Sequence, residues 1–168
     1  MSARNTSNDD RIFAALQKHG VPFIVIGGHA VIRHGYMRTT EDVDVVWLRS
    51  SESARALLAS LTELQAVWIG KEIDRTTGIE RTFPVSAAYI DCQHLMMLWT
   101  PWGPLDLFDY IPGIPDEDVR QLFETGVEGD GLRFSSLSWL RRMKRIAGRT
   151  KDLADLEELA KINPEPDP

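Results

Sequence analysis

The stretch that decides the fold runs from Phe23 to Trp47 and reads FIVIGGHAVIRHGYMRTTEDVDVVW. Its apolar start, residues 23–26, is a β-prone run that stops at Gly27 and Gly28, and a short helix is expected over residues 29–34. A strand, a glycine turn and a helix start leave backbone N–H groups at the positive end of a helix dipole, where phosphate binds. The pair of glycines, Gly27 and Gly28, therefore predicts a phosphate-binding turn, although glycines also serve ordinary tight turns.

Two aspartates, Asp42 and Asp44, stand one residue apart at the start of the apolar run that follows. On a strand, residues two apart project from the same face, so these carboxylates converge on one point. Converging carboxylates repel each other unless a cation lies between them, and a hard divalent ion such as Mg²⁺ takes oxygen ligands of this type. The pattern predicts a metal site, and a turn cap at the strand start is the structural alternative.

A second feature is a basic stretch without acidic residues between positions 141 and 151. Its cations are Arg141, Arg142, Lys144, Arg145, Arg149 and Lys151. Charge runs of this kind are usually solvated helix faces, and the alternative is a contact with a triphosphate or RNA. The net charge of −6 argues against a surface devoted to wrapping nucleic acid, because such binding needs many cations to neutralise phosphates.

Together these motifs resemble the nucleotidyltransferase superfamily of the polymerase-β-like fold, whose signature is a glycine pair followed by Asp-x-Asp. The arrangement is similar to the AbiEii/AbiGii toxin-type branch. The residues that carry this resemblance are Gly27, Gly28, Ala30, His34, Gly35, Arg38, Thr40, Asp42 and Asp44. The segment from Met143 to Leu153 is similar to the Lys-x-x-Ala-Gly-Arg-x-Lys-Asp motif near the end of such proteins.

The resemblance implies a third carboxylate on a later strand, and Asp106 within Leu105–Phe108 fits that position. Asp42, Asp44 and Asp106 are thus the expected catalytic residues and the ligands of Mg²⁺ or Mn²⁺. The residues expected to bind the NTP are Gly27, Gly28, Arg38, Thr40, Lys144 and Arg149. Arg38 and Thr40 have an alternative role, which is to hold the shape of their loop.

The implied reaction moves a nucleoside monophosphate from an NTP such as ATP to an acceptor hydroxyl and releases pyrophosphate. The acceptor is an RNA end, a protein or a small molecule, and the chain is expected to be the toxin of a toxin–antitoxin pair with an antitoxin partner. The alternative is a non-catalytic module of the same fold that binds a nucleotide or a partner.

The chain's 168 residues, 43% of them hydrophobic, suffice for one domain with its own core. That domain is predicted over residues 1–162, followed by a disordered tail over residues 163–168. The single cysteine, Cys92, excludes an intramolecular disulfide and is expected to be a small core residue of a cytoplasmic protein. Residues 1–10 are polar, and no apolar run approaches membrane-spanning length, so no membrane contact is expected.

The remaining patterns predict an α+β fold with a mixed sheet, helices mainly on one face and a helical C-terminal part. Helices are expected from Asp9 or Asp10 to residue 19, from Ser50 or Ser51 to residue 65, and over residues 115–124, 137–147 and 151–161. A hairpin is expected over residues 95–108. Residues 67–93 are ambiguous, with short strands at 67–69 and 81–85 around an exposed loop.

Overall fold

The structure, a computed structural model, describes residues 7–164. Its helices are α1 (Asn8–Lys18), α2 (Gly27–Arg33), α3 (Ser51–Glu63), α4 (Ala87–Cys92), α5 (Val119–Glu124), α6 (Leu137–Ala147) and α7 (Thr150–Ile162). Its strands are β1 (Phe23–Val25), β2 (Val43–Trp47), β3 (Val67–Ile73), β4 (Glu80–Pro84), β5 (Leu95–Thr100), β6 (Gly103–Phe108), β7 (Val127–Gly129) and β8 (Leu132–Phe134). Within these residues, every helix is too short or too polar to span a bilayer.

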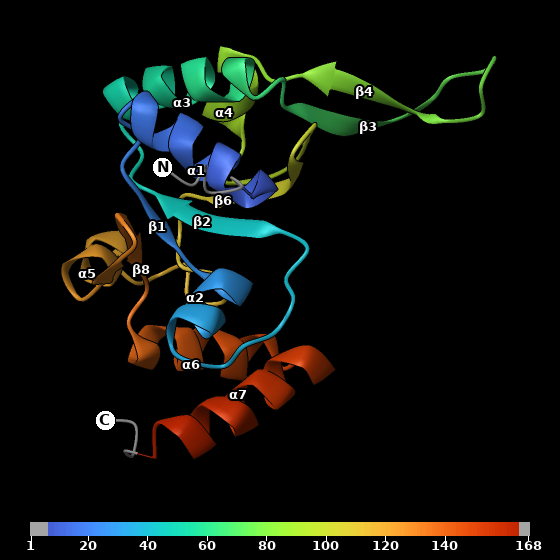
Figure 1. The fold of residues 1–168 in the computed structure, drawn as a ribbon. Helices are drawn as coiled ribbons and strands as arrows, with labels where there is room; N and C mark the ends of the chain where they lie inside the picture. The colour runs from blue at the N-terminus through green and yellow to red at the C-terminus, as the bar shows by residue number, and fades with distance from the viewer. Residues whose placement is uncertain (1–6, 165–168) are drawn as a thin grey trace, which may run out of the picture.

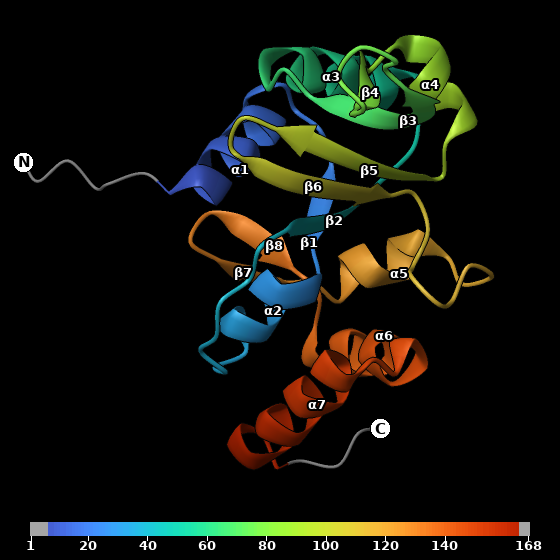
Figure 2. The same cartoon turned by 90° about the vertical axis from the view of Figure 1, so that its right-hand side faces the viewer.

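The strands form one mixed sheet in the order β4-β3-β5-β6-β2-β1-β8-β7. The β1–β8 and β2–β6 pairs are parallel, and the other neighbours are antiparallel. Helices α1, α3 and α4 lie on one side of the central strands, and the helical C-terminal part, α6 and α7, lies on the other (Figures 1 and 2). The predicted α+β class with a mixed sheet and a helical C-terminal part is confirmed.

Successive side chains of the central strands point to opposite faces of the sheet, and each face carries its own apolar cluster. Val43, Val45 and Leu107 are fully buried in the cluster that includes the apolar faces of α1 and α3. Ile24 and Val46 point to the other face and pack with Trp139 and Met143 of α6. Since residues two apart share a face, Asp44 and Asp106 belong to the second face, opposite α1 and α3.

Serine side chains cap the N-termini of three of the helices that the sequence predicts. The hydroxyls of Ser50 and Ser136 accept N–H groups of α3 and α6, and Ser50 is one of the two serines predicted to begin α3. The first helix is capped by Ser7 rather than by an aspartate, and the Asp10 carboxylate in turn accepts the backbone N–H of Ser7. The prediction of Asp9 or Asp10 as the cap was wrong, because Ser7 and Asp10 form a reciprocal capping box.

The ambiguous region is more ordered than expected. Strand β3 extends into the predicted loop as far as Ile73, and with β4 it forms a hairpin that we call the arm, residues 67–84, which projects from the body (Figure 1). The Asp74 carboxylate accepts the N–H groups of Thr76 at 2.8 Å and Thr77 at 3.0 Å, which closes the turn. Helix α4 was not predicted, and Cys92 at its end is exposed, so its assignment to the core was wrong.

The end of the described chain contacts the body. The side-chain amide of Asn163 donates to the carbonyl of His34 at 3.2 Å. Residues 165–168 of the predicted tail, and residues 1–6 of the polar N-terminal segment, lie outside the described residues.

Candidate active site

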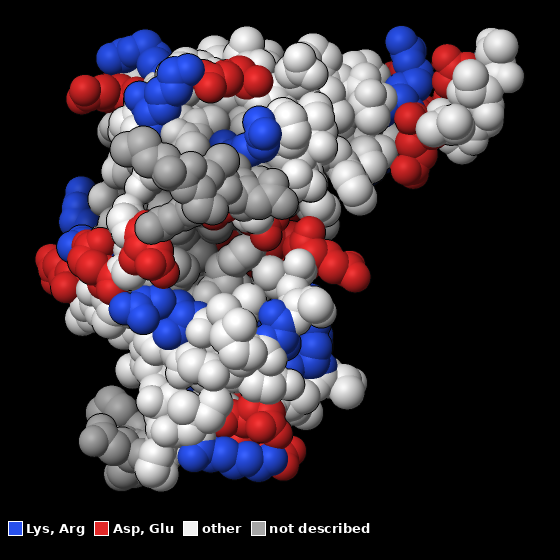
Figure 3. Space-filling view, viewed as in Figure 1, with Lys and Arg blue, Asp and Glu red and all other residues white. Residues whose placement is uncertain are grey.

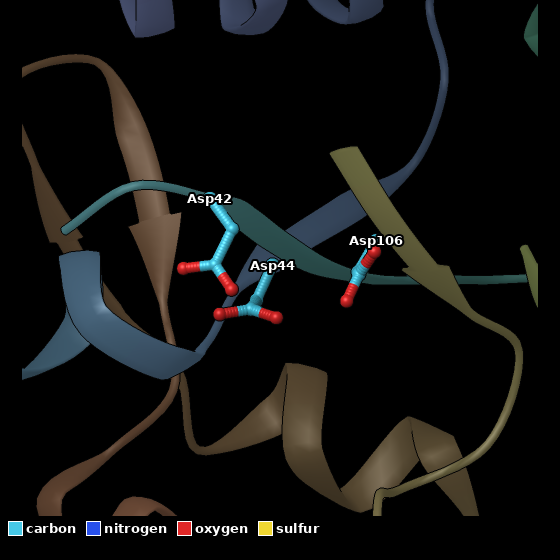
Figure 4. A group of neighbouring side chains, drawn as sticks. All are labelled: Asp42, Asp44 and Asp106. Atoms are coloured by element: carbon cyan, nitrogen blue, oxygen red, sulfur yellow. The ribbon is translucent and has the colours of Figure 1, made fainter. Parts of the chain in front are cut away.

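Three carboxylates converge at the centre of the sheet. Asp42 directly precedes β2, Asp44 lies on it, and Asp44 is paired in register with Asp106 of the parallel neighbour β6. The carboxylates of Asp42 and Asp44 lie side by side, and Asp106 faces them from the adjacent strand (Figure 4). One oxygen from each residue lies within 4.8 Å of those of the other two.

The electrostatics of this cluster favour a cation. Burial raises the pKa of Asp44 to about 6, and the nearby Asp42 and Asp106 add to the increase. Burial, followed by the charge of Asp42, also raises the pKa of Asp106 to about 6. Within residues 7–164, no lysine or arginine forms an ion pair with the three carboxylates. Three hard oxygen donors with unfavourable mutual repulsion fit Mg²⁺ or Mn²⁺.

The glycine pair packs directly against this cluster. Gly27 has φ +60°, and a Cβ there would lie 2.0 Å from Oδ2 of Asp44. A Cβ on Gly28 would lie 2.2 Å from Oγ1 of Thr40. Only glycine therefore fits at these positions, where the chain turns from β1 into α2 next to the aspartates.

The carboxylates open into a cleft of about 420 Å³ between the sheet and the C-terminal helices. Its floor is Asp42, Asp44 and Asp106, and Gly27 borders them. Apolar side chains from β5, β6 and α6 form part of the wall. On the helical side the cleft is lined by three cations, Lys144, Arg149 and Lys151. Such a cavity joins a floor of carboxylate oxygens, which suit a divalent cation, to a wall that is complementary to phosphate.

Two buried aspartates of α7 organise the cations. Asp152 and Asp155 are each 1% exposed. The Lys144 ammonium lies 3.0 Å from Oδ1 of Asp152 and 2.7 Å from Oδ2 of Asp155. Arg149 Nε donates to Asp152 at 2.6 Å. Burial tends to raise the pKa of Asp152, but the hydrogen bonds from Arg149 and Lys144 outweigh it and hold that pKa below its ordinary value.

Asp155 also binds the loop that leads into β2. Arg38 donates to its two carboxylate oxygens, from Nε at 2.8 Å and from Nη2 at 3.0 Å. Two residues farther along this loop, Thr40 Oγ1 lies 3.3 Å from Oδ1 of Asp42. A chain of contacts therefore connects the buried aspartates of α7 to the Asp42 carboxylate.

The predicted residues thus fall into two groups. The three aspartates, Gly27, Lys144 and Arg149 share the cleft, whereas Gly28, Arg38 and Thr40 do not line it and support its edge. Lys144 reaches the cleft with its ammonium already paired to two carboxylates.

Two residues of the site were not among the expected site residues, although Lys151 belongs to the predicted basic stretch. The first is Lys151, an exposed cleft cation that makes no ion pair within the described chain and whose charge lowers the pKa of Asp44 and Asp106. The second is Asp155. The sequence feature that could have identified Asp155 is its spacing from Asp152, because residues three apart lie on one face of a helix.

Comparisons with known proteins bear on the fold. No protein-family model and no curated protein matches the chain. Among solved structures, the antibiotic-resistance factor ANT(2'')-Ia superposes with a TM-score of 0.57 at 14% identity, over 92% of this chain and 81% of that one. The chain has a nucleotidyltransferase-like fold.

Two other structures agree with this fold. JHP933 from Helicobacter pylori superposes with a TM-score of 0.51 at 17% identity, over 96% of this chain and 68% of that one. An antigenic nucleotidyltransferase-like protein from Paracoccidioides brasiliensis gives a TM-score of 0.51 at 20% identity, over 94% and 77% of the two chains.

Proposed function

We propose that the chain is a metal-dependent nucleotidyltransferase that moves a nucleoside monophosphate from an NTP to an acceptor hydroxyl and releases pyrophosphate. The observation that carries this proposal is the convergence of Asp42, Asp44 and Asp106 within 4.8 Å at the floor of a cation-lined cleft. The nucleotidyltransferase-like fold supports it.

The three aspartates would hold Mg²⁺ or Mn²⁺. When bound, the ion neutralises charge on the transferring phosphate and on the leaving pyrophosphate. In this account the acceptor oxygen forms a bond to the α-phosphorus, and the bond from that phosphorus to the oxygen shared with the β-phosphate breaks. Asp106, at the edge of the cluster next to β5, accepts the proton of the acceptor hydroxyl.

The remaining cleft residues bind and position the nucleotide. Lys151 and Arg149 contribute positive charge toward the triphosphate, because both line the cleft on the side facing the carboxylates. Lys144 adds to this wall from its buried position, and Gly27 allows the backbone to approach the phosphates. Arg38 and Thr40 act with Gly28 by holding the loop before β2 in place.

The toxin role extends this proposal. It rests on the similarity of the Gly27–Asp44 stretch and of residues 143–153 to the AbiEii/AbiGii toxin-type branch. In that case an antitoxin partner would control the same transfer reaction. The competing account is a module that binds a nucleotide or a partner without turnover.

The proposal is tested with NTPs labelled on the α-phosphate, Mg²⁺, and total cell protein and total cell RNA as acceptors. We expect label transfer by the wild type and a loss of more than about 100-fold in Asp106→Asn, which keeps the side-chain size but removes the charge. Asp91→Asn, an exposed aspartate outside the cleft, is the matched control. Absence of transfer by the wild type with every NTP and both acceptors would favour the non-catalytic module.

A further inference from the structure

The face of the sheet that carries the catalytic aspartates continues outward beyond the cleft. In antiparallel pairs, residues directly opposite each other share a face. Met97 pairs with Asp106, so it lies on the aspartate face of β5. Trp99 lies two residues farther along β5 and pairs with Val67 of β3, which places Ile69 on this face as well.

The arm prolongs this face. Ile69 pairs with Thr82 and Ile73 pairs with Glu80, with an irregularity between the two pairs. Because Glu80 and Thr82 are two residues apart on β4, Ile73 returns to the same face as Ile69. We call the surface formed by Ile69, Ile73, Met97 and Trp99 the open sheet face.

The open sheet face is exposed and apolar. Ile69 is 42% exposed, Ile73 62%, Met97 64% and Trp99 52%. The opposite face of the same strands is covered, since Met96 and Leu98 are buried in the main core. On β3, Trp68 stacks against Tyr89 of α4, with 5.0 Å between ring centroids. Large exposed apolar side chains that share one side of a sheet indicate a binding surface.

This surface leads directly into the proposed active site. Met97 belongs both to the open sheet face and to the lining of the cleft. Strand β3 is two strands away from β6 in the sheet, a separation of about 10 Å from the strand of Asp106. A molecule bound on the open sheet face therefore lies close enough to reach the carboxylates.

The charges of the arm favour a polypeptide over a nucleic acid. The arm carries three cations, Lys71, Arg75 and Arg81, and three acids, Glu72, Asp74 and Glu80. Arg81 is already paired with Glu72 at 3.0 Å. In Figure 3 the arm, at the upper right, is largely uncharged with both signs side by side near its tip. Such a balanced surface lacks the excess of cations that phosphate backbones require.

The edge of the sheet also favours a polypeptide. Strand β4 is the last strand of the sheet, and within the described chain no other strand pairs with its outer edge. The free backbone N–H and C=O groups of such an edge can pair with an extended polypeptide.

We infer that the open sheet face is the docking surface for the acceptor, and that this acceptor is a polypeptide whose apolar side chains flank the accepting hydroxyl. The inference rests on the proposed nucleotidyl transfer and names its substrate class. The side-chain oxygen of a serine, threonine or tyrosine bonds to the α-phosphorus, pyrophosphate leaves with the electrons of the broken P–O bond, and the hydroxyl proton passes to Asp106.

The experiment compares Trp99→Ala and Ile73→Ser with Ile162→Ser, a control on α7 of comparable exposure, 45%. Each variant and the wild type receive α-labelled NTP, Mg²⁺, and total cell protein or total cell RNA in separate reactions. NTP binding is measured in parallel by calorimetry without any acceptor. The sedimentation coefficient of each variant is measured as well.

We expect label in the protein fraction, a drop of about tenfold or more in transfer for Trp99→Ala and Ile73→Ser, and no change in NTP binding. Ile162→Ser should match the wild type. Label in RNA rather than protein would overturn the inference while leaving the proposed function intact, as would full protein labelling by both surface variants. A wild-type dimer that both variants dissociate would instead make the open sheet face a self-interface and overturn it. A wild type that neither binds NTP nor transfers label would reject the proposed function and, with it, the inference.

Discussion

The substitution Asp44→Asn is expected to stabilise the metal-free protein. Burial and two neighbouring carboxylates raise the pKa of Asp44 from 3.8 to about 6. At about 1.4 kcal/mol per pKa unit, a rise of about two units means that the charged form costs the fold about 3 kcal/mol at neutral pH. Asparagine has the same shape without the charge, so we expect an increase of about 2–3 kcal/mol in the free energy of unfolding.

The pH dependence of this effect has a defined sign. The folded-state pKa of Asp44 lies above its unfolded value, so between about pH 4 and pH 6 the native state binds more protons than the unfolded state. The stability of the wild type therefore falls as pH rises through this window. The advantage of Asp44→Asn should be largest above pH 6 and should vanish below about pH 4.

The assay is thermal and chemical unfolding in EDTA at pH 7.5 and pH 4, with Asp91→Asn as an exposed control. For a chain of this size we expect the melting temperature of Asp44→Asn to exceed that of the wild type by on the order of 5–10 °C at pH 7.5. Mg²⁺ should raise the melting temperature of the wild type and not that of the variant, because only the wild type keeps the full ligand set. A variant that is less stable than the wild type in EDTA at pH 7.5 would refute this reasoning.

Three further substitutions test the surroundings of the site. Lys151→Ala should weaken NTP binding about tenfold and leave nucleoside binding unchanged, because an exposed cation acts through the phosphates; calorimetry with both ligands checks this. Asp155→Asn should lower the free energy of unfolding by about 3 kcal/mol in urea titrations, since Arg38 and Lys144 lose a buried partner, whereas Glu157→Gln on the exposed side of α7 should have little effect. Gly27→Ala should abolish the Mg²⁺-induced rise in melting temperature, because its Cβ would lie 2.0 Å from a carboxylate oxygen; a normal rise would show that the turn tolerates a side chain.

The central sheet and its carboxylates were predictable because strand alternation is a local property. Val43 and Val45 are buried on one face, which fixes Asp44 on the other. The resemblance, together with the apolar residues on both sides of Asp106, sufficed to predict this carboxylate on a later strand, and the structure places that strand next to β2. Helix α3 followed from a serine cap at its start, and α6 was predicted over its observed bounds, residues 137–147.

The polar connections were not predictable because they depend on distant pairings. Arg38 and Asp155 are 117 positions apart in the chain, and nothing near either residue indicates the other. A basic run likewise does not show which of its cations are neutralised by buried acids. Lys144 is paired in this way, whereas Lys151 remains exposed at the cleft. The arm was predicted only as two short strands, residues 67–69 and 81–85, because its charged, exposed residues lack the alternation of a half-buried strand.

The central claim is that the three aspartates serve transfer of a nucleotidyl group, and the position of the transferred phosphate tests it most directly. Parallel reactions with NTP labelled on the α-phosphate or on the γ-phosphate are run with the wild type, Mg²⁺ and cell protein or RNA. The account predicts that α-label becomes bound to the acceptor and that γ-label leaves as pyrophosphate, with both signals lost in Asp42→Asn, Asp44→Asn and Asp106→Asn. Appearance of γ-label on the acceptor would identify a kinase reaction and contradict the account.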